Sequence, residues 1–124
     1  MTQAQMTPEQ ARAQRMQVAN TILCQLAGTG DRDAAARARL STMCGCKDFM
    51  AIEGGVQFGI GRNAAGINKC IVRLTEADLY DVEFGAMRRI KGVLTFKVLD
   101  RTEGVYSDTL KSLFERATGM YLSF

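Results

Sequence analysis

The fold class is decided by the segment LYDVEFGA, residues 79–86, in which apolar and charged side chains alternate. Alternation with a period of two is typical of a half-buried strand. A helix is the competing interpretation, because Thr75 and Asp78 have the spacing of a capping box. Aromatic and β-branched residues favour strands, so the segment predicts a strand. Its inward residues are Tyr80, Val82 and Phe84.

A hairpin is predicted upstream, over residues 49–61. Gly54-Gly55 is a pair that accepts the positive φ values of a tight turn. A two-residue loop there pairs Ala51 with Phe58, and this register gathers the apolar side chains of both strands on one face. The inward residues of the hairpin are Phe49, Ala51, Val56, Phe58 and Ile60.

Two further strands are predicted at residues 69–75 and 93–99, joined to their neighbours by turns at residues 75–78 and 88–92. The glycine-rich loop 59–66 lacks the Lys-Ser/Thr pair of a phosphate-binding loop and precedes a strand, so we predict a plain connection. The inward residues of the two strands are Cys70, Val72, Leu74, Leu94, Phe96 and Val98.

Helices are predicted at both ends of the chain. The first begins with a Thr7 cap followed by Pro8 and ends at Gly28. The last has Ser107 as its cap, carries Leu110, Leu113, Phe114 and Ala117 on one face, and ends at Gly119. Between them, residues 29–42 form either a short alanine-rich surface helix, capped by Asp31 or Asp33, or an inserted segment.

The predicted fold is therefore α+β, in a single domain of 124 residues with a flexible N-terminus at residues 1–6. The N-terminal helix and the possible short second helix precede a five-stranded antiparallel meander. The C-terminal helix packs on one face of that sheet.

The composition argues against catalysis and against a metal or other cofactor. The chain has no His, which removes the commonest general base and metal ligand. The four Cys include one C-x-C pair, Cys44 and Cys46, rather than paired zinc knuckles, so packed thiols are predicted. Asp81 and Glu83 have the spacing of paired carboxylates, but a charged solvent face is the simpler interpretation. With no apolar run long enough to span a membrane and no secretory signal, a cytoplasmic location is predicted.

From Val18 to Phe124 the chain resembles a family of small uncharacterised proteins of tailed phages, prophages and other mobile elements. The resemblance implies a location in the cytoplasm of the bacterial host and brings no assigned activity or site residue. Relative to that family, Thr29 to Leu40 is an insertion. The motifs that carry the resemblance are Gln25-Leu26-Ala27-Gly28, Met43-Cys44-Gly45-Cys46-Lys47-Asp48-Phe49, Tyr80-Asp81-Val82-Glu83-Phe84, Gly104-Val105-Tyr106-Ser107-Asp108 and Thr118-Gly119-Met120-Tyr121.

We therefore expect a non-enzymatic accessory protein that binds another protein or a second copy of itself, and that through this binding modulates a host or phage machine. Outward apolar residues and a net charge of only +3 favour this hypothesis. The candidate oligomer-interface residues are Met50, Ile52, Ile71, Leu79, Met120, Tyr121 and Phe124.

Nucleic-acid binding is the alternative hypothesis. It rests on the basic turn at residues 88–91 and on charged residues of the open sheet face. The candidate binding residues are Arg62, Lys69, Arg73, Asp81, Glu83, Arg88, Arg89, Lys91 and Lys97.

Overall fold

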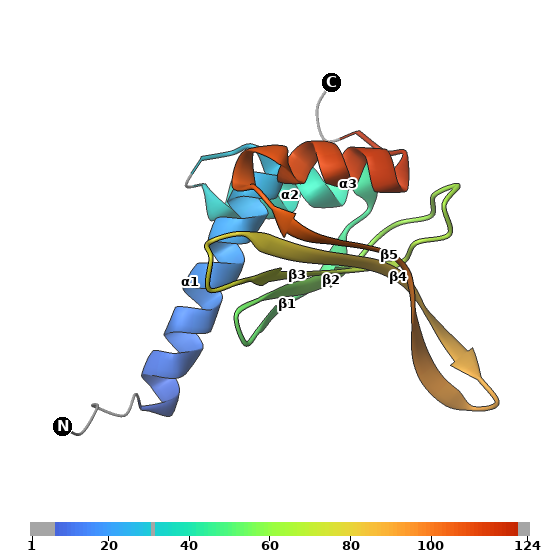
Figure 1. Ribbon diagram of the computed structural model, residues 1–124, viewed down its shortest axis with the longest axis horizontal. Helices are drawn as coiled ribbons and strands as arrows, with labels where there is room; N and C mark the ends of the chain where they lie inside the picture. Colours follow the sequence, from blue (N-terminus) through green and yellow to red (C-terminus); the bar gives the residue numbers. More distant parts are fainter. Residues whose placement is uncertain (1–6, 31, 122–124) are drawn as a thin grey trace.

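The computed structural model describes residues 7–30 and 32–121, and it confirms the α+β fold (Figure 1). The strands form one antiparallel sheet in the order β1-β2-β3-β4-β5, the predicted meander. In chain order the elements are α1 (Pro8–Ala27), α2 (Asp33–Cys44), β1 (Lys47–Ile52), β2 (Gly55–Gly59), β3 (Lys69–Leu74), β4 (Tyr80–Ile90), β5 (Val93–Val105), the 3₁₀ turn η1 (Ser107–Thr109) and α3 (Leu110–Thr118).

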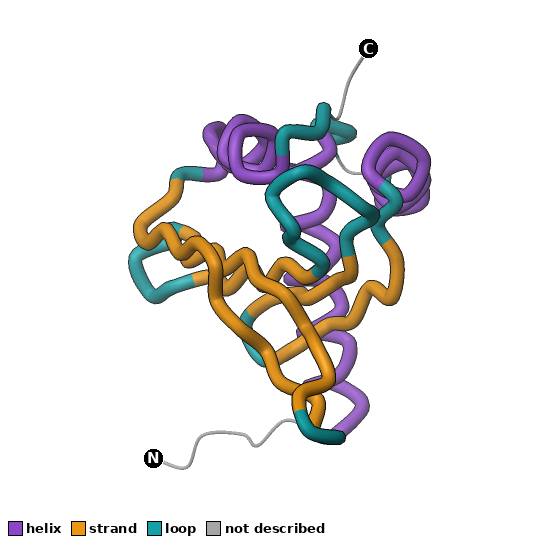
Figure 2. Tube along the Cα trace, turned by 90° about the vertical axis from the view of Figure 1, so that its right-hand side faces the viewer, coloured by secondary structure: helices purple, strands orange, loops and turns teal. Residues whose placement is uncertain are grey.

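The core lies between one face of the sheet and the helices. Buried residues of α1, α2 and α3 form a single cluster with the inward residues of β2, β3 and β4. Phe114 of α3 lies at its centre, with its ring 6.2 Å from that of Phe58 and 6.0 Å from that of Phe84. In Figure 2, α2 and α3 lie above the strands, whereas α1 runs down behind them.

Helix α1 begins and ends as predicted. The Thr7 hydroxyl accepts a hydrogen bond from the backbone N–H of Gln10 at 3.1 Å, and the Gln10 side chain accepts one from the N–H of Thr7. Gly28 closes the helix in the left-handed conformation. The predicted apolar stripe is buried only from Ala19 onward, because the first half of α1 extends past the sheet, and Met16 is exposed.

Residues 29–42 contain a helix, α2, which is longer than predicted and packs on α1. Ala36 and Leu40 are fully buried in the core. Two of its arginines hold α1: the Arg37 side chain donates to Asn20, and Arg39 donates to the carbonyl oxygen of Ala27 at 2.9 Å. The predicted Asp33 cap is wrong, because Arg32 is the N-cap residue and makes no side-chain capping bond. The alternative Asp31 cap lies outside the described residues.

The predicted register of the first hairpin is wrong by two residues. Ala51 pairs with Val56, and the loop is Glu53-Gly54 rather than Gly54-Gly55. Gly55 belongs to β2, where a Cβ atom would lie 2.0 Å from the carbonyl oxygen of Val72. Because a shift of two residues preserves the faces, the predicted inward residues still point to the core.

Strands β4 and β5 are longer than predicted, and the turn between them is shorter. Arg88, Arg89 and Ile90 belong to β4, so the turn is Lys91-Gly92 alone, with φ values of 50° and 80°. The predicted inward face of β5 is also wrong. A bulge between Phe84 and Gly85 shifts the pairing of β4 with β5 by one residue, so the side chains of β5 beyond it change faces. Three residues predicted to be inward therefore lie on the open face: Leu94 opposite Arg89, Phe96 opposite Met87 and Val98 opposite Gly85.

Two smaller corrections concern β3 and α3. Leu74 was predicted to be inward, but it is exposed, because it is the last residue of β3. Ser107 does not cap α3 through its side chain: a 3₁₀ turn precedes the helix, and the Thr109 hydroxyl donates to the carbonyl oxygen of Tyr106 at 2.9 Å. Gly119 ends α3 in the left-handed conformation, as predicted.

Candidate binding surface

The longest uninterrupted run of exposed residues in the described chain, 88–95, lies at the far end of the β4–β5 hairpin, whose residues 85–98 we call the arm. It projects from the sheet at the end away from α2 and α3 (Figure 1). Apolar side chains at its tip are not covered: Val93 is 65% exposed and Leu94 61%. Such a ribbon contributes little to the core, so its sequence calls for another explanation.

The arm also holds the positive charge of the molecule. Residues 85–98 contain four cations and no Asp or Glu. Since the whole chain has a net charge of +3, the remainder carries −1. All four cations are exposed; they are Arg88, Arg89, Lys91 and Lys97.

The pairing of β4 with β5 gives the arm two unlike faces. Arg88 pairs with Thr95, and Ala86 with Lys97, so that face is polar and basic up to the aliphatic tip. The opposite face is mostly apolar, although Arg89 lies on it opposite Leu94. Lys69 covers another part of it, with its Nζ atom 5.7 Å from the centre of the Phe96 ring. The apolar residues of that face are Met87, Leu94, Phe96 and Val98.

Strand β5 is an edge strand of the sheet and is thirteen residues long. Within the described part of the chain, the backbone of residues 93–103 forms backbone hydrogen bonds only with β4. Val98 and Leu99, at its middle, are both more than 40% exposed. A long, apolar, unpaired edge is a template for pairing with another strand.

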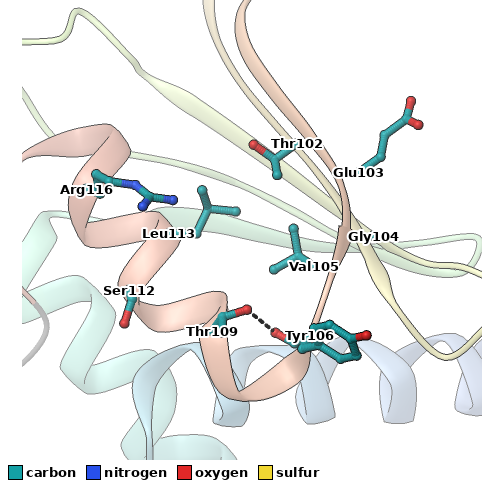
Figure 3. Close-up of a pocket in the computed structure, with 9 residues that line it drawn as sticks. All are labelled: Thr102, Glu103, Gly104, Val105, Tyr106, Thr109, Ser112, Leu113 and Arg116. Atoms are coloured by element: carbon teal, nitrogen blue, oxygen red, sulfur yellow. Dashed lines mark hydrogen bonds between the residues drawn. The ribbon is translucent and has the colours of Figure 1, made fainter.

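A hollow of about 340 Å³ lies between the C-terminal half of β5 and α3 (Figure 3). Val105 and Leu113 form its apolar floor, and Arg116 stands at its rim. Polar side chains also line the hollow, among them Thr102, Glu103 and Ser112, and the hydrogen bond drawn in Figure 3 joins Thr109 and Tyr106.

The charged residues of the open sheet face largely satisfy one another. Arg73 forms an ion pair with Glu83 at 3.3 Å, and Asp81 accepts a hydrogen bond from the backbone N–H of Gly104. The side chains of Asp81 and Glu83 are therefore engaged in structural bonds, which favours the solvent-face interpretation over paired catalytic carboxylates. Lys97, predicted on this face, lies opposite Ala86 on the other one.

The remaining predicted binding residue, Arg62, is exposed on the β2–β3 loop, apart from the arm. The Asn63 side chain holds this loop: it donates to the carbonyl oxygen of Gly61 at 2.9 Å and accepts from the N–H of Ile67 at 3.2 Å. The loop is therefore shaped by its own asparagine, in agreement with a plain connection.

The predicted oligomer-interface residues are scattered. Met50 is 56% exposed and Tyr121 71%, on different parts of the molecule. Ile71 was expected to be exposed, but only 7% of it is, because it lies on the central strand between Gln57 and Glu83. Phe124 lies outside the described residues. Three of the predicted interface residues are half-buried: Ile52, Leu79 and Met120.

All four cysteines are buried. Burial raises the pKa of Cys44 to about 11 and that of Cys46 to about 12, and it raises the pKa of Cys70 well above its ordinary value. These groups stay protonated at neutral pH and are poor nucleophiles. Among the described residues, no three Cys, Asp or Glu side chains are arranged to hold a metal ion.

Comparison of the chain with known protein families, with curated proteins and with solved structures finds no match. No helix in the described ranges is both long and apolar enough to cross a membrane. Sequence reasoning identified the arm's cations but placed Leu94 and Val98 on the buried face. The exposure of these two residues depends on the bulge in the pairing of β5 with β4, which no local sequence pattern indicates.

Proposed function

We propose that the protein is a non-enzymatic binding protein that holds duplex nucleic acid on its arm. The observation that carries the proposal is the concentration of four cations, with no acid, on an exposed two-stranded ribbon. Phosphate backbones attract such a charge pattern, and a two-stranded ribbon fits the major groove of a duplex. Arg88 on the basic face and Lys91 at the tip of the arm supply the phosphate contacts.

A duplex suits the arm better than a single strand does. Proteins that bind single strands stack bases on exposed aromatic rings. Phe96 is the one aromatic residue of the arm, and it is half-buried beside Lys69. The lack of His in the chain and the buried, protonated thiols support a role without catalysis.

The test is a titration of a labelled duplex, followed by fluorescence anisotropy at about 50 mM and about 200 mM salt. The double variant Arg88→Gln/Lys91→Gln should bind at least about tenfold more weakly and lower the salt slope by about two. Arg12→Gln/Arg15→Gln removes the same charge from exposed positions on α1 and should leave binding unchanged. Absence of wild-type binding at the lower salt concentration, or equal losses in both double variants, contradicts the proposal.

A protein partner or self-association is the second candidate function. The observation that favours it is the long free edge of β5, with exposed Val98 and Leu99 at its middle. Added strands recognise such an edge through backbone hydrogen bonds, and side chains then provide the specificity.

A further inference from the structure

We propose that the free edge of β5 is completed by β5 of a second copy of this chain, in an antiparallel pair about a two-fold axis. The inference deepens the second candidate function and uses a different surface from the nucleic-acid proposal. A two-fold interface is self-complementary, so the sequence on either side of the axis must match itself in charge and shape.

The charges of β5 have this complementarity about the middle of the strand. Lys97 precedes Val98-Leu99, and Asp100 follows it. With the axis between Val98 and Leu99, Lys97 of each copy lies opposite Asp100 of the second copy. Both side chains are exposed, and neither forms an ion pair within the described part of the chain.

The bulge in the β4–β5 ladder makes this pairing sterically consistent. Residues three apart in a regular strand point to opposite faces. Here the bulge places Lys97 opposite Ala86 and Asp100 opposite Phe84, which are both on the helix-covered face of β4. Lys97 and Asp100 therefore share a face, as directly opposed residues of two paired strands must.

The same register brings the aliphatic tip of the arm to the hollow beside α3. Val93 lies opposite Gly104 of the second copy, next to the hollow floored by Val105 and Leu113 (Figure 3). Val93 and its ladder partner Ile90 are both more than half exposed. A second copy covers these side chains and fills the hollow, which is the burial that the isolated chain lacks.

The cations of the two arms do not oppose this pairing. Each Lys91-Gly92 turn lies about seven residues from the axis, so the two turns are about 46 Å apart at the usual strand rise. The Debye length at 0.1 M salt is about 10 Å, and repulsion between the tips is screened.

Light scattering tests the inference at a protein concentration of about 100 μM, far above a Kd near 1 μM. The wild type should have twice the chain mass of 13.6 kDa. Lys97→Asp and Asp100→Lys should each give the monomer mass, because each variant places like charges in contact across the axis. An equimolar mixture of the two variants restores opposite charges in both contacts and should recover the dimer mass.

A monomeric wild type, single variants that remain dimeric, or a mixture that remains monomeric would each overturn the proposed pairing. Circular dichroism verifies that both variants are folded, which their exposed positions allow. The two proposals fail separately. A monomeric protein that still binds the duplex contradicts only the proposed β5–β5 pairing. A dimeric protein without affinity for the duplex contradicts only the proposed nucleic-acid binding.

Discussion

Gly55 and Gly59 stand at the two ends of β2 and meet different surroundings. A Cβ atom at Gly55 would lie 2.0 Å from the carbonyl oxygen of Val72, whereas one at Gly59 would first meet Lys47 at 3.5 Å. The backbone of β3 approaches β2 so closely at Gly55 that no side chain fits there. At Gly59 a methyl group makes ordinary van der Waals contact.

We expect Gly55→Ala to lower the free energy of unfolding by about 3 kcal/mol, because the methyl group forces β2 and β3 apart. Gly59→Ala is the matched control and should change it by less than about 1 kcal/mol. Urea denaturation measures both. Similar losses for the two variants would show that the close approach at Gly55 does not exist.

The buried thiols make stability depend on pH in alkaline solution. Cys46 has a pKa of about 12 in the folded chain, against an ordinary value of 9.0. Above pH 9 the unfolded chain therefore loses this proton first, and the free energy of unfolding falls as pH rises. One such thiol contributes up to about 1.4 kcal/mol per pH unit until the folded pKa is reached.

Cys46→Ala should weaken this pH dependence. Between about pH 8 and about pH 10, the loss of unfolding free energy should be smaller in the variant by about 1 kcal/mol. Chemical denaturation at both pH values gives the difference, and groups common to both proteins, such as Tyr80, cancel. Parallel losses in the two proteins would mean that Cys46 ionises normally in the folded state.

At the scale of the elements, the turn of the arm combines a demanding geometry with an unusual residue. Lys91 and Gly92 both have positive φ, which is the pattern of the type I′ hairpin turn. Gly accepts this conformation freely, but Lys does not. Lys91 therefore lowers the stability of the turn, which is consistent with a function for its positive charge.

Lys91→Asn should stabilise the arm, because Asn tolerates the left-handed region better than Lys. We expect amide exchange at residues 88–95 to slow by about fivefold, with no change in the core amides. Lys91→Gln is the control, since it removes the same charge without easing the turn, and it should leave exchange unchanged. Equal protection in the two variants would assign the effect to charge.

The sequence predicted the type and order of the elements well, because periodicity and caps are local signals. It failed where the outcome depended on pairing between distant segments. The bulge between Phe84 and Gly85 reversed the predicted faces of β5, because a prediction from strict alternation assumes that the strand pairing has no bulge. Leu94 and Val98 were expected in the core, although the arm extends beyond anything that covers them. The cations of the candidate site were identified because charge is read directly from sequence.

For the whole molecule, the separation of arm and core means that the arm can be shortened without loss of the fold. We expect replacement of residues 89–94 by Asn-Gly, which keeps Arg88 paired with Thr95, to change the free energy of unfolding by less than about 1 kcal/mol. The removed side chains are all exposed. Urea denaturation measures this, and a cooperative loss of the core would contradict it.

The order of the strands has a consequence for synthesis of the chain. Each strand pairs with its neighbours in sequence, so the sheet can assemble hairpin by hairpin as the ribosome extends the chain. Its apolar face cannot close in the same stepwise way, because Phe114 belongs to the last helix and packs between Phe58 and Phe84. Until α3 has emerged, the part of the apolar face around Phe58 and Phe84 stays open, and this is the interval in which a chaperone would be needed.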